Sequence, residues 1–359
     1  MSVEDKVSLM NDIAAIKTRR TRQSCLVAAL SFLKRTIAIG INENLSMNMA
    51  SLLLAALLAA VATPTMAADP ALAEIVPTLT RGTPWKQTAA IPVQFETFHP
   101  QGMVKIGDDF FFSSVDIRTP TKRFAQLQDG YDRDAGEGVG YLFKMDKTGK
   151  MIAKVQLGEG SMYHPGGIDF DGRHIWVPTA EYRPNSASII YRVDPQTMQA
   201  EEMFRFKDHV GGIVHNTDDK SLHGVSWGSR RLYTWPIDGS GKPTNLAKSP
   251  EQLRVINRAL YIDYQDCHYI GSSKMLCSGL NNYRASPDAA VFRLGGIEIV
   301  DLKTNQATWQ APVELGSPTS GLPMTQNPVW VEPMSNGIRA YFMPDDNKST
   351  LFVYEAVTK

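Results

Sequence analysis

Residues 163–183 read YHPGGIDFDGRHIWVPTAEYR, and this stretch decides the fold class of the chain. It predicts two β-strands joined by a tight turn at Asp171-Gly172, because Asp tolerates turn geometry and Gly supplies a positive φ. Ile175-Trp176-Val177 lies in the second strand, and Glu181-Tyr182-Arg183 ends it. An isolated hairpin is at best marginally stable in water, so the recurrence of this pattern along the chain is the more informative observation.

The pattern of first strand, turn and second strand recurs in five units. The first strands begin near His99, His164, His209, Gln265 and Asn327. The second strands end at Asp116-Ile117-Arg118, Glu181-Tyr182-Arg183, Gly228-Ser229-Arg230, Asn282-Tyr283-Arg284 and Asp346-Asn347-Lys348. A third strand follows in each unit and a fourth in most, and the units begin about 45–65 residues apart. Five such units predict an all-β chain whose residues 85–359 form a five-bladed β-propeller.

The fifth unit lacks a fourth strand, and Trp85–Phe95 reads as a strand without a partner of its own. We expect this strand to complete the last blade, which closes the ring and protects the sheet edges. A six-bladed ring is the alternative, if Gly239–Tyr264 hides a degenerate blade. Ser249-Pro250-Glu251, within that connection, predicts the start of a helix.

The N-terminal residues 1–68 predict a leader with a signal peptide. Ala50–Ala62 is an apolar run of thirteen residues, shorter than the roughly 20 that span a bilayer. Small residues follow and suit signal-peptidase cleavage near Ala67 or Ala68. An uncleaved membrane anchor is the alternative. The leader predicts a periplasmic or secreted protein that is not attached to the membrane after processing.

More than one methionine could be the true start of the chain. A start at Met47 or Met49 would leave residues 1–46 outside the protein. Residues 69–84 follow the leader, and we expect them to form a linker to the propeller.

Composition and charge restrict the partners of the folded region. The chain is 43% hydrophobic and 21% charged, which is typical of a globular protein. After residue 68 it has 30 basic and 33 acidic residues, a formal charge of −3 that gives no support for nucleic-acid binding. We therefore predict a monomer that binds a small molecule and no nucleic acid.

Two cysteines follow the leader. Cys267 and Cys277 flank Gly271-Ser272-Ser273-Lys274, which reads as a hairpin turn. On neighbouring strands they would face each other, so a disulfide bond is expected in an oxidising compartment. Two buried free thiols are the alternative.

The segments HPQGM (residues 99–103) and HPGGI (residues 164–168) resemble the His-Pro-x-Gly starts of calcium-dependent lactonase and phosphotriesterase propellers, a group with paraoxonase- and gluconolactonase-like enzymes. That resemblance implies six blades and a calcium ion held by Glu, Asn and Asp. The overall pattern of the chain resembles a family of secreted bacterial and fungal propellers of uncharacterised function. This second resemblance implies no activity.

In a propeller the first strands start, and the second strands end, on one face around the mouth of the central channel. A cation ends each second strand, and Arg presents a planar fork suited to carboxylate or phosphate. We predict a substrate-binding rim formed by Arg118, Arg183, Arg230, Arg284, Asp116, Glu181, Asn282, Tyr182 and Tyr283. Structural ion pairs between each arginine and a neighbouring acid are the alternative.

Three first strands begin with a histidine, namely His99, His164 and His209. Neutral imidazoles that converge on an axis can hold a divalent metal ion or act as general acids and bases. We predict both roles for them, with Tyr163 as a further proton donor. The alternative is a device that starts the strand, with each imidazole bonded to a backbone carbonyl. The loop Thr119–Gly138 reads as a lid, a calcium loop or a solvated surface loop.

The sequence favours an exported enzyme that acts on a small anionic or aromatic oxygenated compound at this mouth. Metal-assisted hydrolysis of an ester or lactone is the first hypothesis, and the metal is the expected cofactor. A lyase reaction by His and Tyr acid–base chemistry is an alternative, as is a non-enzymatic module that binds a ligand or protein. We find no nucleotide or flavin motif, no Gly-x-Ser-x-Gly elbow and no His-Glu-x-x-His helix.

Overall fold

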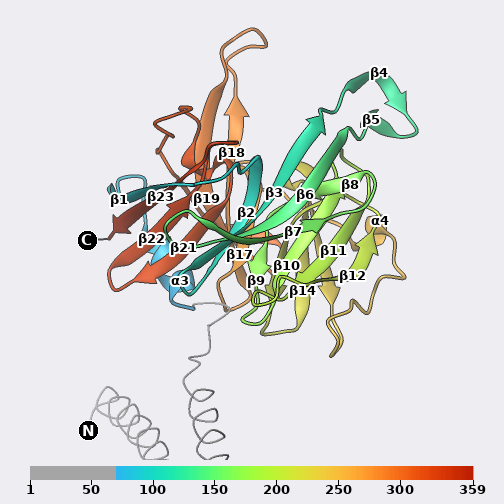
Figure 1. Ribbon diagram of the computed structural model, residues 1–359, viewed down its shortest axis with the longest axis horizontal. Coiled ribbons are helices and arrows are strands. Elements are labelled where there is room, and N and C mark those ends of the chain that lie inside the picture. The colour runs from blue at the N-terminus through green and yellow to red at the C-terminus, as the bar shows by residue number, and fades with distance from the viewer. Residues whose placement is uncertain (1–69, 359) are drawn as a thin grey trace, which may run out of the picture. The chain divides into compact units, whose positions relative to one another are not determined.

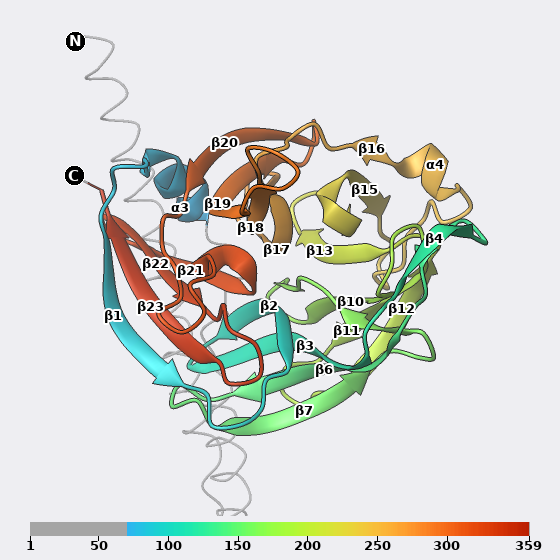
Figure 2. The ribbon, with the colours of Figure 1, turned by 90° about the horizontal axis from the view of Figure 1, so that it is seen from above.

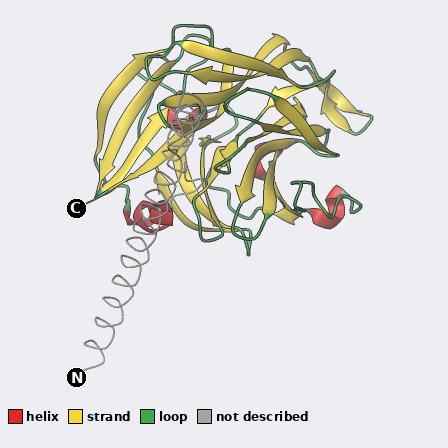
Figure 3. Cartoon of the chain, turned by 60° about the horizontal axis from the view of Figure 1, so that its bottom comes forward, coloured by secondary structure: helices red, strands yellow, loops and turns green. Residues whose placement is uncertain are grey.

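The computed structural model describes residues 70–358. Strands dominate it, and five sheets surround a central axis as the blades of a β-propeller (Figure 2, Figure 3). This confirms the predicted all-β class and five blades rather than six. Within the described part of the chain, no helix is both long and apolar enough to cross a membrane. The leader predicted in residues 1–68 lies outside the described residues.

Each of blades 1 and 2 consists of antiparallel strands ordered from the axis outward. Blade 1 contains β2 (His99–Ile106), β3 (Asp109–Thr119), β6 (Glu137–Met145) and β7 (Met151–Leu157). Blade 2 contains β8 (Met162–Pro165), β9 (Asp169–Phe170), β10 (Ile175–Glu181), β11 (Ser188–Val193) and β12 (Ala200–Phe206). The predicted turn at Asp171-Gly172 joins β9 to β10, so the opening stretch is the inner half of blade 2.

Blades 3, 4 and 5 follow the same order. Blade 3 contains β13 (Val210–Asn216), β14 (Ser221–Ser226), β15 (Arg231–Pro236) and the short β16 (Val255–Ile256). Blade 4 contains β17 (Asp263–Tyr269), β18 (Lys274–Tyr283), β19 (Phe292–Asp301) and β20 (Gln306–Pro312). Blade 5 contains β21 (Val329–Met334), β22 (Gly337–Phe342), β23 (Thr350–Val357) and β1 (Trp85–Pro92).

Burial follows the position of a strand within its blade. The second strand β10 is buried along nearly its whole length, because neighbouring blades cover both of its faces. The outer strand β7 alternates between half-buried and exposed residues, because one of its faces meets solvent. The core therefore lies between the blades, in five clusters of buried apolar side chains.

Strand β1 closes the ring as predicted. It pairs antiparallel with β23, from Trp85 opposite Ala356 to Pro92 opposite Thr350. The two ends of the described chain therefore share blade 5 (Figure 2). In blade 4, Cys267 lies directly opposite Cys277, and the two form the expected disulfide bond.

Part of the predicted linker, residues 70–78, is helical. These residues form α3 (Pro70–Ile75) and the 3-10 turn η1 (Val76–Thr78). Leu72, Val76 and Leu79 are buried in the cluster that includes the core of blade 5. Leu72 lies in α3, Val76 begins η1 and Leu79 follows η1, and burial of these three apolar side chains attaches this segment to the propeller core.

The connection after β15 contains α4 (Pro250–Leu253), which starts at the predicted N-cap. The Ser249 side chain caps the first turn, and the Gln252 side chain accepts a hydrogen bond from the Ser249 backbone nitrogen at 2.9 Å. The second strand of blade 3 ends in the turn η2 (Trp227–Ser229), and η3 (Met324–Gln326) precedes blade 5. No sixth blade forms in this connection, because it contributes only β16.

A buried carboxylate on the axis joins four of the five blades. Oδ2 of Asp266, in blade 4, accepts hydrogen bonds from the backbone nitrogens of Met103 (2.8 Å) and Val329 (3.4 Å), and Oδ1 accepts one from Ile168 (3.2 Å). These three residues belong to blades 1, 5 and 2. Nε2 of His268 lies 3.3 Å from Oδ2 of the same carboxylate.

A second buried carboxylate completes this axial network. Asp169, in blade 2, accepts hydrogen bonds from the backbone nitrogens of His215 in blade 3 (2.9 Å) and Tyr269 in blade 4 (3.3 Å). Burial disfavours the charged form of His268, but the nearby carboxylates of Asp266 and Asp169 outweigh it and raise the His268 pKa to about 10. The axial network of Asp169, Asp266 and His268 thus connects all five blades.

Glycines let the first strands approach each other on the axis. A Cβ atom on Gly102 would lie 2.5 Å from the backbone nitrogen of Ile168, and one on Gly167 would lie 2.9 Å from the carbonyl oxygen of Gln265. Gly167 also forms a parallel bridge with Gly212 of the next blade. Gly102 and Gly167 therefore reflect the narrow axis of a five-bladed ring, whereas a Cβ atom on Gly212 would meet no atom closer than 3.9 Å.

Candidate functional site

A cavity of about 230 Å³ lies where the first strands begin and the second strands end. Its lining includes His99, His164, His209, Tyr182, Trp227 and Asp263. A more open hollow of about 600 Å³ shares His99 and Tyr182 with the cavity and adds Glu96, Asp116 and Asp346. The three predicted histidines therefore meet at one end of the axis, and we name this cavity the axial mouth.

Each histidine of the axial mouth has a different partner. Nδ1 of His99 is 2.9 Å from Oδ1 of Asp346, in the connection from β22 to β23 of blade 5. Nδ1 of His209 is 2.8 Å from the carbonyl oxygen of Glu181, which places a proton on Nδ1 and leaves Nε2 as an acceptor. Nε2 of His164 is buried and has no hydrogen-bond partner among the described residues.

Two of these imidazoles are neutral at pH 7. Burial, followed by repulsion from His99 and His209, holds the pKa of His164 well below its ordinary value. Burial also lowers the pKa of His209 to about 4. The axial mouth therefore presents neutral nitrogens, which can bind a metal ion or a polar ligand without first losing a proton.

Aromatic rings form one wall of the axial mouth. Tyr182 stacks on His164, with ring centres 4.2 Å apart and planes inclined by 14°. Trp227 lies 5.6 Å from Tyr182 and 4.9 Å from His209, measured between ring centres. Burial raises the pKa of Tyr182, so its hydroxyl stays protonated. Such a wall suits a planar ligand that stacks on one of the rings.

The spacing of the histidines does not match a bound zinc ion. The ring centres of His99 and His164 are 6.2 Å apart, and those of His164 and His209 are 6.4 Å apart. Two imidazoles on one tetrahedral zinc have ring centres about 5 Å apart, given Zn–N bonds of about 2.0–2.1 Å. Within residues 70–358, no group of three His, Cys, Asp or Glu residues is arranged to hold a metal ion.

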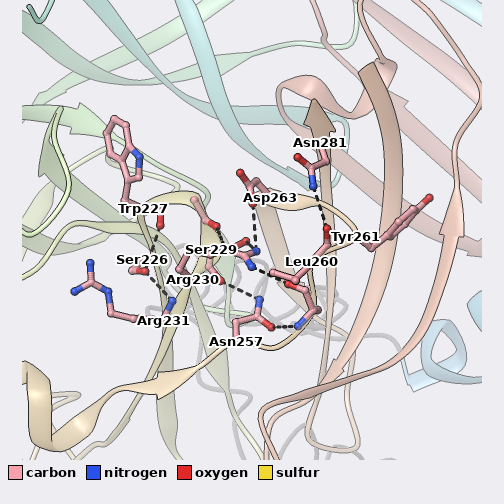
Figure 4. Close-up of polar contacts among 12 residues, drawn as sticks. Ser226, Trp227, Ser229, Arg230, Arg231, Asn257, Leu260, Tyr261, Asp263 and Asn281 are labelled. Carbon is pink, nitrogen blue, oxygen red and sulfur yellow. Dashed lines mark hydrogen bonds and ion pairs between the residues drawn. The ribbon is translucent and has the colours of Figure 1, made fainter. Parts of the chain in front are cut away.

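The predicted arginine rim is largely engaged in local contacts. Nε of Arg118 is 3.3 Å from Asp116, and Nε of Arg183 is 2.5 Å from Glu181. Arg230 contacts Asp263 at 3.2 Å and also donates to the Gly228 and Ala259 carbonyls (Figure 4). These ion pairs are the arrangement that the alternative reading of the rim expected. Among the described residues, the lining of the axial mouth includes no arginine.

The other predicted residues lie away from the histidines. The hydroxyl of Tyr163 donates to the Ala135 carbonyl at 2.7 Å, and burial raises its pKa to about 12. Tyr283 donates to the Tyr261 carbonyl, and Arg284 donates to the Pro287 carbonyl. The exposed Asn282 precedes them on the protruding end of β18 (Figure 1). The structure therefore brings together the histidines and Tyr182, but not Tyr163, Asn282, Tyr283 or Arg284.

Three residues of the mouth were not singled out from the sequence. Asp346 begins the triplet Asp346-Asn347-Lys348, which matches Asp116-Ile117-Arg118 in the sequence repeat, so its partnership with His99 had a signal although it lies in the connection from β22 to β23. Trp227 directly follows β14, in the turn η2 of blade 3, and Asp263 begins β17. Nothing in the repeat pattern distinguishes these two residues from core or turn positions.

Solved structures that resemble the chain do so weakly. Hydrazine synthase of Kuenenia stuttgartiensis has a TM-score of 0.36 and 14% identity over 76% of this chain and 66% of its own. A tail fibre of Staphylococcus aureus phage P68 has a TM-score of 0.39 and 9% identity over 79% and 55%. A nidogen/laminin complex has a TM-score of 0.34 and 9% identity over 60% and 80%. The chain thus spans less than two thirds of the length of the first two structures, and similarity this low carries no argument about function.

Family comparison gives a firmer result. No curated protein matches the chain. The model of a family described as a family of unknown function, DUF6454, matches residues 57–359, which includes every blade of the propeller. This confirms the expected resemblance to a propeller family of uncharacterised function. The chain is a member of the DUF6454 family.

Proposed function

We propose that the axial mouth is the active site of an enzyme that hydrolyses a small aromatic or anionic ester or lactone. The observation that carries this proposal is the 2.9 Å contact between Nδ1 of His99 and the carboxylate of Asp346. A carboxylate that accepts the Nδ1 proton fixes the tautomer of an imidazole and leaves Nε2 as a base. His99 lines the axial mouth, so this base lies beside the space that a substrate would occupy.

The hydrolytic step follows from this pair. Nε2 of His99 takes a proton from water while the water oxygen attacks the carbonyl carbon. Asp346 stabilises the imidazolium that forms. Collapse of the tetrahedral intermediate breaks the bond between the carbonyl carbon and the leaving oxygen, and His99 returns its proton to that oxygen. One water is consumed, and the histidine ends in its starting state.

The neutral His164 supplies the second part of the mechanism. Its Nε2 is buried without a partner, so as the tautomer protonated on Nε2 it can donate to the carbonyl oxygen as negative charge develops there. A donor in a site that excludes water is worth more than the same donor in water. Tyr182 stacks on this imidazole and holds its plane, and Trp227 offers a face to an aromatic substrate.

A metal-assisted reaction is a second candidate, supported by the chemistry of the donors. Metal-bound histidines usually donate their other nitrogen to a carboxylate or a carbonyl, as His99 and His209 do here. Their ring separations of 6.2 and 6.4 Å from His164 are too large for one zinc ion, so the fit is incomplete and no step is assigned to a metal.

Turnover of simple substrates tests the proposal. Purified protein is assayed with 4-nitrophenyl acetate and dihydrocoumarin before and after dialysis against a chelator. We expect His99→Ala and Asp346→Asn to lower kcat about 10²- to 10⁴-fold, the usual contribution of a general base. His174→Ala is the matched control, because His174 follows the turn that joins β9 to β10, outside the lining of the mouth.

Four outcomes are informative. Failure to cleave either compound, or unchanged kcat in both variants, contradicts the hydrolase proposal. Loss of activity on chelation that added zinc restores favours the metal candidate. Abstraction of a proton from a carbon acid, without ester cleavage, favours the lyase alternative from the sequence. Ligand binding without any turnover favours a binding module.

A further inference from the structure

A two-stranded arm extends from blade 1 toward the axial mouth. It consists of β4 (Arg123–Gln128) and β5 (Tyr131–Arg133), inserted between β3 and β6. The arm leaves its own blade and reaches over blade 2 toward blade 3 (Figure 1, Figure 2). The loop predicted as a lid, a calcium loop or a surface loop is therefore an ordered hairpin whose contacts lie at the mouth.

Two stacked contacts hold the arm in place. The guanidinium of Arg183, from blade 2, lies 3.5 Å from the ring centre of Tyr131. The guanidinium of Arg133 lies 4.9 Å from the ring centre of Trp227, from blade 3. Cations over aromatic faces attract the ring electrons, more strongly where water is excluded. Trp227 lines the axial mouth, so Arg133 contacts a residue of its wall.

Arg133 keeps one edge of its guanidinium unused. Nε and Nη2 donate to the two carboxylate oxygens of Asp132, at 2.9 Å each. Nη1 makes no hydrogen bond to any residue between 70 and 358, although only 13% of the side chain is exposed. The pair with Asp132 restrains the guanidinium, so its free edge can bind an anion at little entropic cost.

The hydroxyl of Tyr182 is a second donor on a residue that shares Trp227 as a neighbour with Arg133. Tyr182 lines the mouth and packs against Trp227, with ring centres 5.6 Å apart, and the Arg133 guanidinium packs against the same tryptophan at 4.9 Å. In the described chain the Tyr182 hydroxyl has no hydrogen-bond partner, and its contacts are through the ring. A guanidinium edge and a phenol hydroxyl over a tryptophan face suit a planar carboxylate conjugated to an aromatic ring.

The predicted arginines are less suited to this role. Arg183 is already enclosed by Glu181 and Tyr131. Arg230 distributes its donors over two backbone carbonyls, Ser229 and Asp263. The missed residue Arg133 therefore has the more available donors at the wall of the mouth.

We propose that Arg133, with Tyr182 and Trp227, forms a subsite for the carboxylate of an aromatic acid at the outer end of the axial mouth. This subsite rests on the proposed function, because it assigns the charge and the ring of the substrate of the same site. The arm is then the element that selects the ligand, and the histidines are the element that reacts with it.

Binding of benzoate and benzyl alcohol to the full-length protein tests the subsite without any reaction. The two compounds share a ring and differ in charge, and titration calorimetry reports their affinities. We expect the wild type to bind benzoate more tightly, and Arg133→Gln to weaken benzoate about tenfold or more while leaving benzyl alcohol within twofold. Arg133→Lys keeps the charge but loses the planar fork, so it should recover part of the affinity.

Arg123→Gln is the matched control. Arg123 belongs to the same arm and approaches the same partner, Asp132, at 3.4 Å, but 74% of its side chain is exposed. It should bind benzoate as the wild type does. The subsite is contradicted if the wild type does not prefer benzoate, if Arg133→Gln weakens both compounds equally, or if Arg123→Gln weakens benzoate as much.

Ester cleavage separates this inference from the proposed function. The pair 4-acetoxybenzoate and phenyl acetate differs only in the carboxylate, and Arg133→Gln should raise KM for the first alone. Binding that depends on Arg133 without cleavage of either ester would contradict the hydrolase and leave the subsite standing. Cleavage of both esters with equal KM would contradict the subsite and leave the hydrolase proposal standing.

Discussion

Nε2 of His268 and Oδ2 of Asp266 lie 3.3 Å apart on the propeller axis, and neither side chain is more than 8% exposed. The same carboxylate accepts backbone hydrogen bonds from three other blades. Burying this charge destabilises the fold little while all of its partners are present. Removing one partner lowers the free energy of unfolding strongly.

Asp266→Asn should therefore destabilise the whole ring. The amide nitrogen of Asn would face the backbone N–H groups of Met103 and Val329, which need an acceptor, and His268 would lose its ion pair. We expect the free energy of unfolding to fall by about 3–5 kcal/mol, the usual cost of breaking a buried pair. Urea denaturation followed by circular dichroism measures it.

Asp108→Asn is the control, because Asp108 is an exposed acid paired with Lys147 at the outside of blade 1. It should change stability little. Equal unfolding curves for Asp266→Asn and the wild type would show that the axial carboxylate does not hold the blades together.

Alkaline pH should weaken the same network. The pKa of His268 is raised from 6.5 to about 10 in the folded protein. A base with a raised pKa contributes stability that is fully present below its unfolded pKa and is lost as pH rises toward the folded value. The free energy of unfolding should therefore decrease between pH 6.5 and pH 10, by on the order of a few kcal/mol.

Removing the imidazole should remove this slope. His268→Gln is expected to be less stable than the wild type at pH 7 and to lose less stability on going to pH 10. His174→Gln, a histidine outside the axial network, should keep the wild-type slope. A slope that survives in His268→Gln would mean that another group titrates in this window.

Gly102→Ala tests the narrow axis. The added Cβ would lie 2.5 Å from the Ile168 nitrogen and 2.6 Å from the Gly167 Cα, both backbone atoms that cannot rotate away. Overpacking of this kind costs about 1–3 kcal/mol or more, so the melting temperature should fall by several degrees. Calorimetry measures the change.

Gly239→Ala is the matched control, because a Cβ at Gly239 would meet no atom within 4 Å. It should leave the melting temperature nearly unchanged. Equal melting temperatures for Gly102→Ala and Gly239→Ala would show that the first strands have room to separate. The explanation of the His-Pro-x-Gly spacing would then be wrong.

Glu298→Met should stabilise the protein at neutral pH. Glu298 faces Cys277 across strands β18 and β19, is fully buried, and has no hydrogen-bond partner for either carboxylate oxygen among the described residues. Burial raises the pKa of this carboxyl, and the nearby Tyr264 hydroxyl and Arg230 only moderate the effect. A methionine of similar size removes the cost of burying the charge, on the order of 1 kcal/mol or more.

The sign of its pH dependence is a stricter test. An acid with a raised pKa destabilises the fold increasingly as pH rises above its unfolded pKa, here 4.5, toward the folded value. The advantage of Glu298→Met should therefore be larger at pH 8 than at pH 5. A variant that melts below the wild type at both pH values would show that the carboxyl has a stabilising partner.

The sequence repeat was sufficient to predict most of the fold and part of the candidate site. Period-two strands with turns at regular spacing predicted the blades, the closing strand Trp85–Phe95 and the meeting of His99, His164 and His209, because these features recur at matching positions. Contacts between blades do not recur. Asp266 reaches Met103 across 163 residues, and Arg133 reaches Trp227 from an insertion in a single blade, so no local pattern indicated either.

Closure by β1 also decides when the ring can form. β1 lies at the start of the propeller and its partner β23 at the end, so blade 5 stays incomplete until residues 350–357 have been synthesised. Until then β1 has no partner strand, and its unpaired edge and apolar side chains stay exposed. Such unpaired strand edges favour aggregation. The pairing of β1 with β23 is therefore a late step of folding, because it joins the first and last strands of the propeller.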